Sequence, residues 1–230
     1  MINPKQMQTV AAGRARTYAV LSALYAAPPG ADLMETIREG GLVQDERGPF
    51  GAAANDLTFF FREAASGTQL ENELAAEHTR LFVLPTGVVP HEAFYADENR
   101  RLGGRVTVAV QQYYEEASAR LTGACLELPD HMGVELEFMK FLCDIEEQFW
   151  KEPNWAGLQK CLSFQNGFLA EHLLRWYRPL CERIIDETNL DMYRALARLT
   201  IAFLEDEQKD VPELTQEIHS EGRTPCVTES

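Results

Sequence analysis

The sequence predicts an all-α protein, a single globular multi-helix domain followed by a polar C-terminal tail. Strand-like alternation of apolar and polar residues is nearly absent. Apolar residues instead recur at helical spacing between proline and glycine breaks. The chain has 230 residues, of which 45% are hydrophobic, enough to bury one sizeable core. We expect the helical domain to span residues 1–208 and a flexible, disordered tail to span residues 209–230.

Each helix is predicted from an apolar stripe and the breaks beside it. The first helix is expected over residues 5–26, where a stripe that includes Tyr18 and Tyr25 ends before two prolines. A later helix contains Pro179, and we expect a kink or break there because proline removes a backbone hydrogen bond. The helices after the first are expected over residues 32–39, 53–65, 70–82, 107–121, 131–150, from 153–154 onward, 168–186 and 191–207.

One long segment, residues 84–104 (LPTGVVPHEAFYADENRRLGG), lacks helical periodicity. Loops of about twenty residues inside a compact domain are uncommon and usually functional. This segment mixes apolar, polar and aromatic side chains, as a binding edge does: Pro90, His91, Glu92, Phe94 and Tyr95. The alternative is an ordinary connection whose aromatic rings pack on the core, and the residues alone leave both interpretations open.

Composition limits the partners of the protein. It has 36 acidic and 21 basic residues, a formal net charge of −15, so it should repel nucleic acid and anionic membranes and attract basic partners. Eighteen consecutive apolar residues occur nowhere, and the N-terminus has no secretory pattern. The five cysteines include no CxxC pair, which favours a reducing compartment. We therefore expect a cytoplasmic protein with no membrane insertion and no nucleic-acid partner.

The predicted helix over residues 131–150 carries ionisable groups where a core would take leucine. On a helical wheel its apolar positions fill two adjoining arcs that cover well over half of the circumference, so the helix should be mostly buried. Glu135 and Glu146 lie between these arcs, Asp130 and His131 precede them, and His131 is one turn before Glu135. A buried, unpaired carboxylate is costly, so these groups need partners or an opening to solvent.

Two interpretations of this line of groups stay open. In the first, each has a structural role: Asp130 caps a helix, His131 is a satisfied core histidine, and Glu135 and Glu146 pair with an internal arginine. The arginines that we consider for this are Arg14, Arg16 and Arg80. In the second, all four line an acidic cleft with apolar walls, which suits a peptide that has arginines next to an apolar run.

Motifs of conventional enzymes are absent from the sequence. It contains no GxxxxGK[ST], GxGxxG, GxSxG or HExxH pattern, and none of its five histidines follows a glutamate by three residues. We therefore expect a non-enzymatic peptide-binding protein without catalytic residues, cofactor or metal. The alternatives are a helical metal-binding protein or enzyme that uses His131 and Glu135, and an adaptor whose acidic tail, residues 205–230, docks a basic partner.

Five segments, in this order, resemble the TorD/DmsD family of chaperones for molybdenum-cofactor oxidoreductases. They are ARTYAVLSALYAAPP, HTRLFVLPTGVVPHEAFY, LPDHMGVELEFM, FLAEHLLRW and MYRALARLTIAFLEDE. The match runs over roughly residues 14–207, and its Asp-His segment is the most specific part. The resemblance implies an all-helical TorD-like fold, either a monomer or a homodimer. It also implies binding to the N-terminal leader, often a twin-arginine signal, of a molybdopterin oxidoreductase catalytic subunit. The chaperone would assist cofactor insertion and assembly before export.

The resemblance also implies a set of binding residues. Asp130 and His131 would lie in the peptide-binding region. The loop would line it with Pro90, His91, Phe94 and Tyr95, and Phe82 and Tyr25 would support its wall. Glu135 and Glu146 join this set from the helical wheel and not from the family motif. The sequence departs from the family at Ala93, where a serine is frequent, and at Pro129, which directly precedes the aspartate.

Overall fold

The structure is a computed structural model that describes residues 2–40, 48–64, 67–121 and 126–221. These residues form helices and connections, with no strand among them beyond an isolated β-bridge between His91 and His131. The prediction of an all-α fold is thereby confirmed. In this part of the chain, none of the helices combines the length and the apolar character that a membrane span requires.

The helices follow one another with short connections. They are α1 (Pro4–Ala26), α2 (Ala31–Arg38), α3 (Gly48–Glu63), α4 (Thr68–His78), α5 (Glu92–Ala96), α6 (Arg105–Glu116), α7 (Met132–Lys151), α8 (Trp155–Phe168), α9 (Leu174–Glu187) and α10 (Asp191–Glu221). Two short π-helical turns complete them: η1 (Thr79–Val83) continues α4, and η2 (Leu169–Leu173) joins α8 to α9.

Helices α1 and α7 form the centre of the bundle and run antiparallel. Gln8 near the start of α1 bonds Glu147 near the end of α7 at 3.2 Å, and Ser22 near the end of α1 bonds the carbonyl of Gly133 at 2.7 Å. A Cβ at Gly133 would lie 3.1 Å from the Ser22 carbonyl oxygen, so the missing side chain lets the two backbones approach closely.

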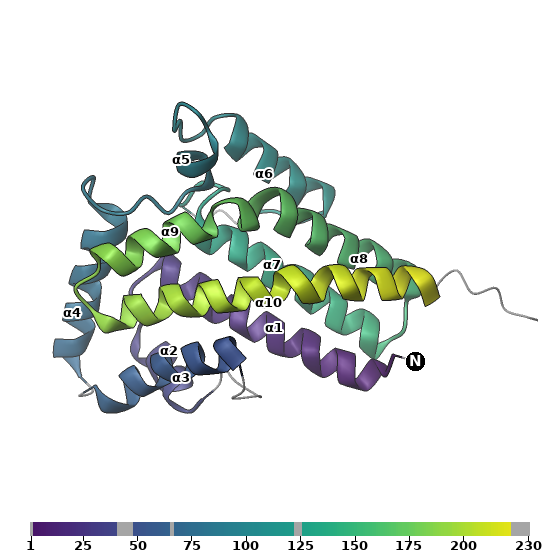
Figure 1. Cartoon of the computed structure of the whole chain (residues 1–230), viewed down its shortest axis with the longest axis horizontal. Helices are drawn as coiled ribbons and strands as arrows, with labels where there is room; N and C mark the ends of the chain where they lie inside the picture. The colour runs from purple at the N-terminus through teal and green to yellow at the C-terminus, as the bar shows by residue number, and fades with distance from the viewer. Residues whose placement is uncertain (1, 41–47, 65–66, 122–125, 222–230) are drawn as a thin grey trace, which may run out of the picture.

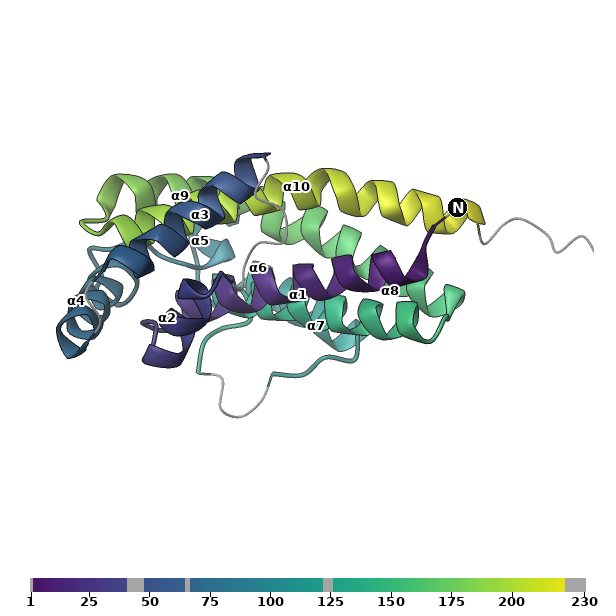
Figure 2. The same cartoon turned by 90° about the horizontal axis from the view of Figure 1, so that it is seen from below.

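The other helices surround this pair. Helix α10 lies along the side of the bundle and packs on α3, α8 and α9 (Figures 1 and 2). Helices α2, α3 and α4 gather toward the end of the bundle away from the N-terminus, and α5 and α6 lie on the far side of α9 from α10 (Figure 1). The predicted stripe of α1 is confirmed, because Tyr18, Leu21, Leu24 and Tyr25 are fully buried in the main core.

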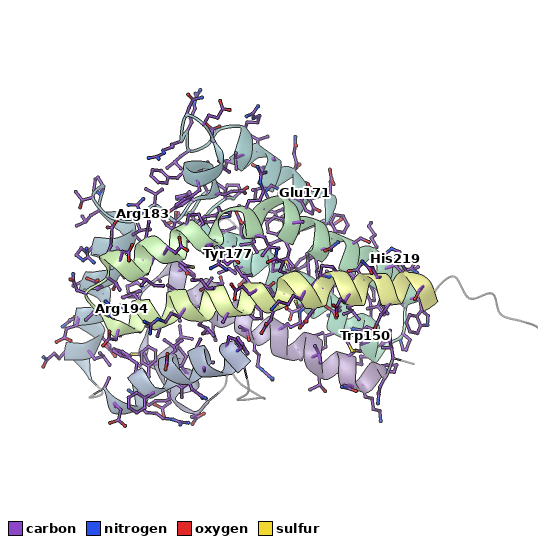
Figure 3. All side chains as sticks on the ribbon, in the orientation of Figure 1. Trp150, Glu171, Tyr177, Arg183, Arg194 and His219 are labelled. Carbon is purple, nitrogen blue, oxygen red and sulfur yellow. The ribbon has the colours of Figure 1, made fainter. Side chains whose placement is uncertain are left out.

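The last helix is longer than predicted. We expected it to end at residue 207, but α10 continues to Glu221, so residues 209–221 are not a disordered tail. Val211, Thr215 and Ile218 repeat at helical spacing and are buried, and Ile218 packs in a second cluster with Trp150. Figure 3 places Trp150 and His219 at the same end of the molecule. The rest of the expected tail, residues 222–230, lies outside the described residues.

Two further boundaries differ from the prediction. The expected break at Pro179 is wrong, because α9 continues through that proline and the irregularity lies earlier, in η2. Residues 84–104 are not wholly irregular, because α5 forms in their middle. Three of the five cysteines, Cys143, Cys161 and Cys181, are buried free thiols, and the other two lie outside the described residues.

Candidate functional site

The loop over residues 84–104 and the start of α7 lie side by side, joined through their backbones. The N–H of Glu92 donates to the Asp130 carbonyl at 2.9 Å, and the N–H of Met132 donates to the Pro90 carbonyl at 2.9 Å. These two bonds flank the bridge between His91 and His131. The structure thus brings together the two segments that the sequence singles out, and we call this contact the loop–α7 seam.

Asp130 is fully buried in the seam and caps a helix, although not the one that follows it. Its Oδ2 accepts from the N–H of Ala93 at 3.1 Å, in the first turn of α5, and its Oδ1 lies 3.6 Å from Nδ1 of His91. Burial alone would raise the pKa of Asp130, but the His91 ring and the Ala93 N–H outweigh it and lower the pKa. The carboxylate therefore stays ionised and holds α5 against α7.

His131 is the residue that caps α7. Its Nδ1 accepts from the N–H of Gly133 at 3.1 Å, and its ring is 4% exposed and lies 5.1 Å from the ring of His91, centroid to centroid. Burial, followed by the charge of His91, lowers the pKa of His131 to about 3. The imidazole is therefore neutral at physiological pH, with Nδ1 serving as an acceptor.

Glu135 lies one turn further along α7 and is also fully buried. Its Oε2 accepts from the indole N–H of Trp176 at 3.1 Å, while its Oε1 has no hydrogen-bond partner among the described residues. Glu92, which is bonded to His172 at 2.8 Å, adds a nearby negative charge. Burial, followed by the charge of Glu92, raises the pKa of Glu135 well above its usual range. Of the two interpretations that the sequence left open for Glu135, a structural role fits, but the partner is the indole of Trp176 and not an internal arginine.

Replacing Glu135 by glutamine should therefore cost little near pH 5 and should increase relative stability as the pH rises. A carboxyl with a raised pKa in the folded state contributes stability that is lost above the unfolded pKa of 4.5. The amide keeps an acceptor for Trp176 and does not titrate. Urea unfolding should show the variant gaining on the wild type, by at most about 1.4 kcal/mol per pH unit, as the pH rises from 4.5 toward the raised pKa of the folded state. A difference that does not change with pH would contradict the assignment.

Glu146 belongs to a separate, internal network, about 16 Å along α7 from Glu135. Its Oε2 accepts from Arg14 at 2.7 Å and from Gln165 at 2.9 Å, and its Oε1 accepts from the indole of Trp150 at 3.0 Å. Arg14 is bound at the same time by Glu207 through two bonds of 2.7 Å. The expectation that Glu146 lines an open cleft is wrong. The pairing with Arg14 that the sequence left open is correct.

The aromatic residues expected around the site pack mostly onto the core. The ring of Tyr95 stacks on Trp176 with centroids 5.7 Å apart, and Phe82 lies 5.9 Å from Tyr25, which is fully buried. Phe94 is half-buried beneath the guanidinium groups of Arg100 and Arg183, which lie 4.9 and 5.7 Å from its ring centre. Arg100 adds a positive charge beside Phe94, whereas Arg183 is already paired with Glu187 at 3.0 Å.

An open groove lies on the other side of His131, and we call it the α7 groove. It has a volume of about 700 Å³ and is bounded by the end of α1, the first half of α7 and the connection from α6 to α7. The described parts of that connection that line the groove are residues 118–121 and 126–127. Apolar residues dominate the groove, with His131 and two carboxylates among them. The lining includes Ala26, Ala119, Leu121, Leu126, Val134, Phe138 and Phe141, with Ser22, Ser118, Arg120, Glu127, His131 and Glu137.

The helical wheel puts Val134, Phe138 and Phe141 on one of the two apolar arcs that were expected to be buried, but Val134 and Phe141 are only half-buried where they line the groove. The sequence analysis did not identify the other wall of the groove, which is the connection from α6 to α7. The leucines of that connection could have indicated it, since Leu126 is 95% exposed. Solvent-exposed leucines beside an open helix face are typical of a docking surface. Within the described residues, no three His, Cys, Asp or Glu side chains are grouped so that they could hold a metal ion.

Comparisons with known proteins place the chain in a family. The profile of the nitrate reductase delta subunit family matches residues 44–182. A chaperone protein TorD from Vibrio cholerae serotype O1 is 28% identical over 149 residues, 64% of this chain and 66% of that protein. A chaperone protein TorD from Photobacterium profundum is 27% identical over 177 residues, 75% of this chain and 78% of that protein.

A solved structure supports the fold. A candidate redox enzyme maturation protein from Archaeoglobus fulgidus matches with a TM-score of 0.50 and 16% identity, over 84% of this chain and 94% of that one. The chain spans just under two thirds of the length of the Vibrio cholerae relative. The resemblance to the TorD/DmsD family is thereby confirmed. Because the family profile covers more than half of its residues, the chain belongs to the nitrate reductase delta subunit family, with TorD chaperones among its relatives.

Proposed function

We propose that this protein is a cytoplasmic chaperone that binds the N-terminal leader of a molybdopterin oxidoreductase catalytic subunit. It would assist cofactor insertion and assembly of that subunit before export. The observation that carries the proposal is the α7 groove, an open apolar trough that begins at His131 of the Asp-His segment. The relationship to proteins named TorD supports the same assignment.

The groove suits the chemistry of a leader with an apolar run and flanking arginines. Val134, Phe138 and Phe141 offer successive turns of one apolar helix face, against which an amphipathic peptide can pack. Two carboxylates of the groove, Glu127 and Glu137, are exposed and can accept hydrogen bonds from arginine. The arginines of the leader are therefore expected at these carboxylates.

Energetics assign most of the affinity to the apolar contacts. A hydrogen bond to a charged group contributes about 1.5–3 kcal/mol, so two captured arginines contribute about 3–6 kcal/mol. Micromolar binding requires about 8 kcal/mol, and ordering a flexible peptide costs more. The remainder must come from apolar burial, at about 25 cal/mol per Å². The carboxylates then set the orientation of the leader, and the groove holds it.

The residues of the seam take a supporting role in this proposal. Asp130, Pro90 and His91 fix the loop to the start of α7, and His131 lies both in the seam and in the groove wall. Glu135, Glu146 and Tyr25 are sealed inside the protein and support the binding surface without touching the peptide. Phe94 and Tyr95 support the packing of the loop through their contacts with each other and with Trp176, and Phe82 packs on Tyr25.

Replacing Phe141 by aspartate should weaken binding of the leader peptide at least about tenfold, because it removes apolar area and places a charge on the groove floor. Calorimetry with a synthetic twin-arginine leader peptide of a molybdopterin oxidoreductase measures the effect. Phe59→Asp is the matched control, since Phe59 on α3 is 65% exposed and outside the groove. Equal affinities of the two folded variants would refute the groove as the leader site.

A further inference from the structure

A second groove lies on a different side of the molecule, between α1, α3 and α10. We call it the α10 groove, and its volume is about 390 Å³. Its floor is apolar and is formed by Val10, Phe50, Phe203, Val211 and Leu214. Val10, in the first half of α1, is 42% exposed. An open apolar floor of this kind is costly to leave in water unless a partner covers it.

The rim of the α10 groove is strongly acidic. Asp206, Asp210, Glu213 and Glu217 follow one another along α10 at spacings of four, three and four residues, so they form one stripe. Glu207 also borders the groove, but its carboxylate is already bound by Arg14. Like charges at this spacing repel, and they destabilise the free helix.

The pKa of Asp210 reflects the repulsion between these carboxylates. Burial, followed by the charges of Glu207, Asp206 and Glu213, raises it above its usual value. A cation placed in the groove would relieve this repulsion.

We propose that the α10 groove binds a cationic amphipathic helix of a partner protein, which buries an apolar face on the floor and pairs lysines or arginines with the stripe. The stripe from residue 206 to residue 217 is about 16 Å long, which matches about three turns of helix. A second copy of this chain is a poor occupant, because each copy carries a formal charge of −15. Charge complementarity instead selects a basic partner with apolar residues three and four apart.

This site is distinct from the leader site of the proposed function. The α10 groove uses Met7, Val10 and Arg14 from the first half of α1, whereas the α7 groove uses Ser22 and Ala26 at its end. Val10 and Ser22 are twelve residues apart, about 18 Å along the helix. Both grooves can therefore be occupied at once, and each can be tested without the other.

The test uses the full-length protein and a fluorescein-labelled helix of fourteen leucine and lysine residues, with fluorescence anisotropy as the readout. Replacing three rim carboxylates (Asp210→Asn, Glu213→Gln, Glu217→Gln) should weaken probe binding about tenfold, because each exposed ion pair contributes modestly. A charge-matched control (Glu116→Gln, Glu182→Gln, Asp186→Asn) removes exposed carboxylates from α6 and α9 and should change binding less than about twofold. Equal weakening by both triple variants would overturn the proposal in favour of diffuse attraction.

Two substitutions distinguish the contribution of the apolar floor from that of the rim carboxylates, and the α10 groove from the α7 groove. In a Phe141→Asp background, which removes probe binding in the α7 groove, Val10→Lys should abolish most of the remaining probe binding by placing a cation on the apolar floor. Unaltered binding by Val10→Lys would overturn the proposal. So would a concentration-dependent dimer in sedimentation that Val10→Lys dissolves, since the groove would then belong to a second copy.

Discussion

Replacing Arg14 by methionine is expected to lower the free energy of unfolding by about 3–5 kcal/mol, the usual cost of removing one partner from a buried ion pair. The side chain of Arg14 is 10% exposed and lies between Glu146, which is fully buried, and Glu207, which is 4% exposed. Without the guanidinium, two carboxylates are left in the core without their cation. Methionine fills part of the volume, so the loss reports mainly on charge and hydrogen bonding.

Urea unfolding at neutral pH measures this loss, and Arg16→Met provides the control. Arg16 lies two residues away on the same helix and is exposed, so its replacement should change the free energy of unfolding by less than about 0.5 kcal/mol. Adding Glu146→Gln and Glu207→Gln to Arg14→Met should recover much of the loss, because neutral amides are less costly to bury than unpaired charges. If Arg14→Met and Arg16→Met are equally stable, the network has no net role in stability.

The sequence predicted the helical architecture, but it did not determine which partners the buried acidic residues have. Periodicity shows that Glu146 faces the interior, because a wheel needs only local spacing. It cannot choose among Arg14, Arg16 and Arg80, because the choice depends on how α1 crosses α7. The bond between Arg14 and Glu146 joins residues 132 positions apart. Glu135 was harder still, since its partner Trp176 and its charged neighbour Glu92 come from two other elements.

The candidate site was likewise predicted only in part, because the sequence identifies its segments but not how they pack together. The seam was anticipated, since the resemblance placed Pro90 and His91 beside Asp130 and His131, and the backbone bonds join them. The sequence analysis missed the α7 groove, because the groove depends on how the connection from α6 to α7 lies relative to one face of α7. The end of α10 was missed because residues 209–221 are polar overall, and three buried positions at helical spacing were outweighed by the surrounding charges.

Replacing His131 by asparagine should increase the stability of the protein in acid relative to the wild type. Asparagine is among the best N-cap residues, so it can accept from Gly133 as the imidazole does, but it does not titrate. The pKa of His131 is lowered from 6.5 to about 3 by burial and by the charge of His91, with His78 acting in the same direction and Asp130 against it. Below pH 6.5 the imidazole of His131 therefore binds a proton in the unfolded chain but not in the folded chain. Stability falls by about 1.4 kcal/mol per pH unit from this residue alone.

The pH dependence that Glu135 contributes to stability has the opposite sign to that of His131, so the two variants can be told apart. Its raised pKa means that the folded chain keeps a proton which the unfolded chain releases above pH 4.5, so stability falls as the pH rises. Relative to the wild type, His131→Asn should gain about 3 kcal/mol on acidification from pH 6.5 to 4.5, whereas Glu135→Gln should lose stability on acidification toward pH 4.5. His219→Asn, near the end of α10, controls for the loss of a histidine and should follow the wild type. If His131→Asn also follows the wild type, the ring of His131 is not held neutral in the seam, and the capping role assigned to it is wrong.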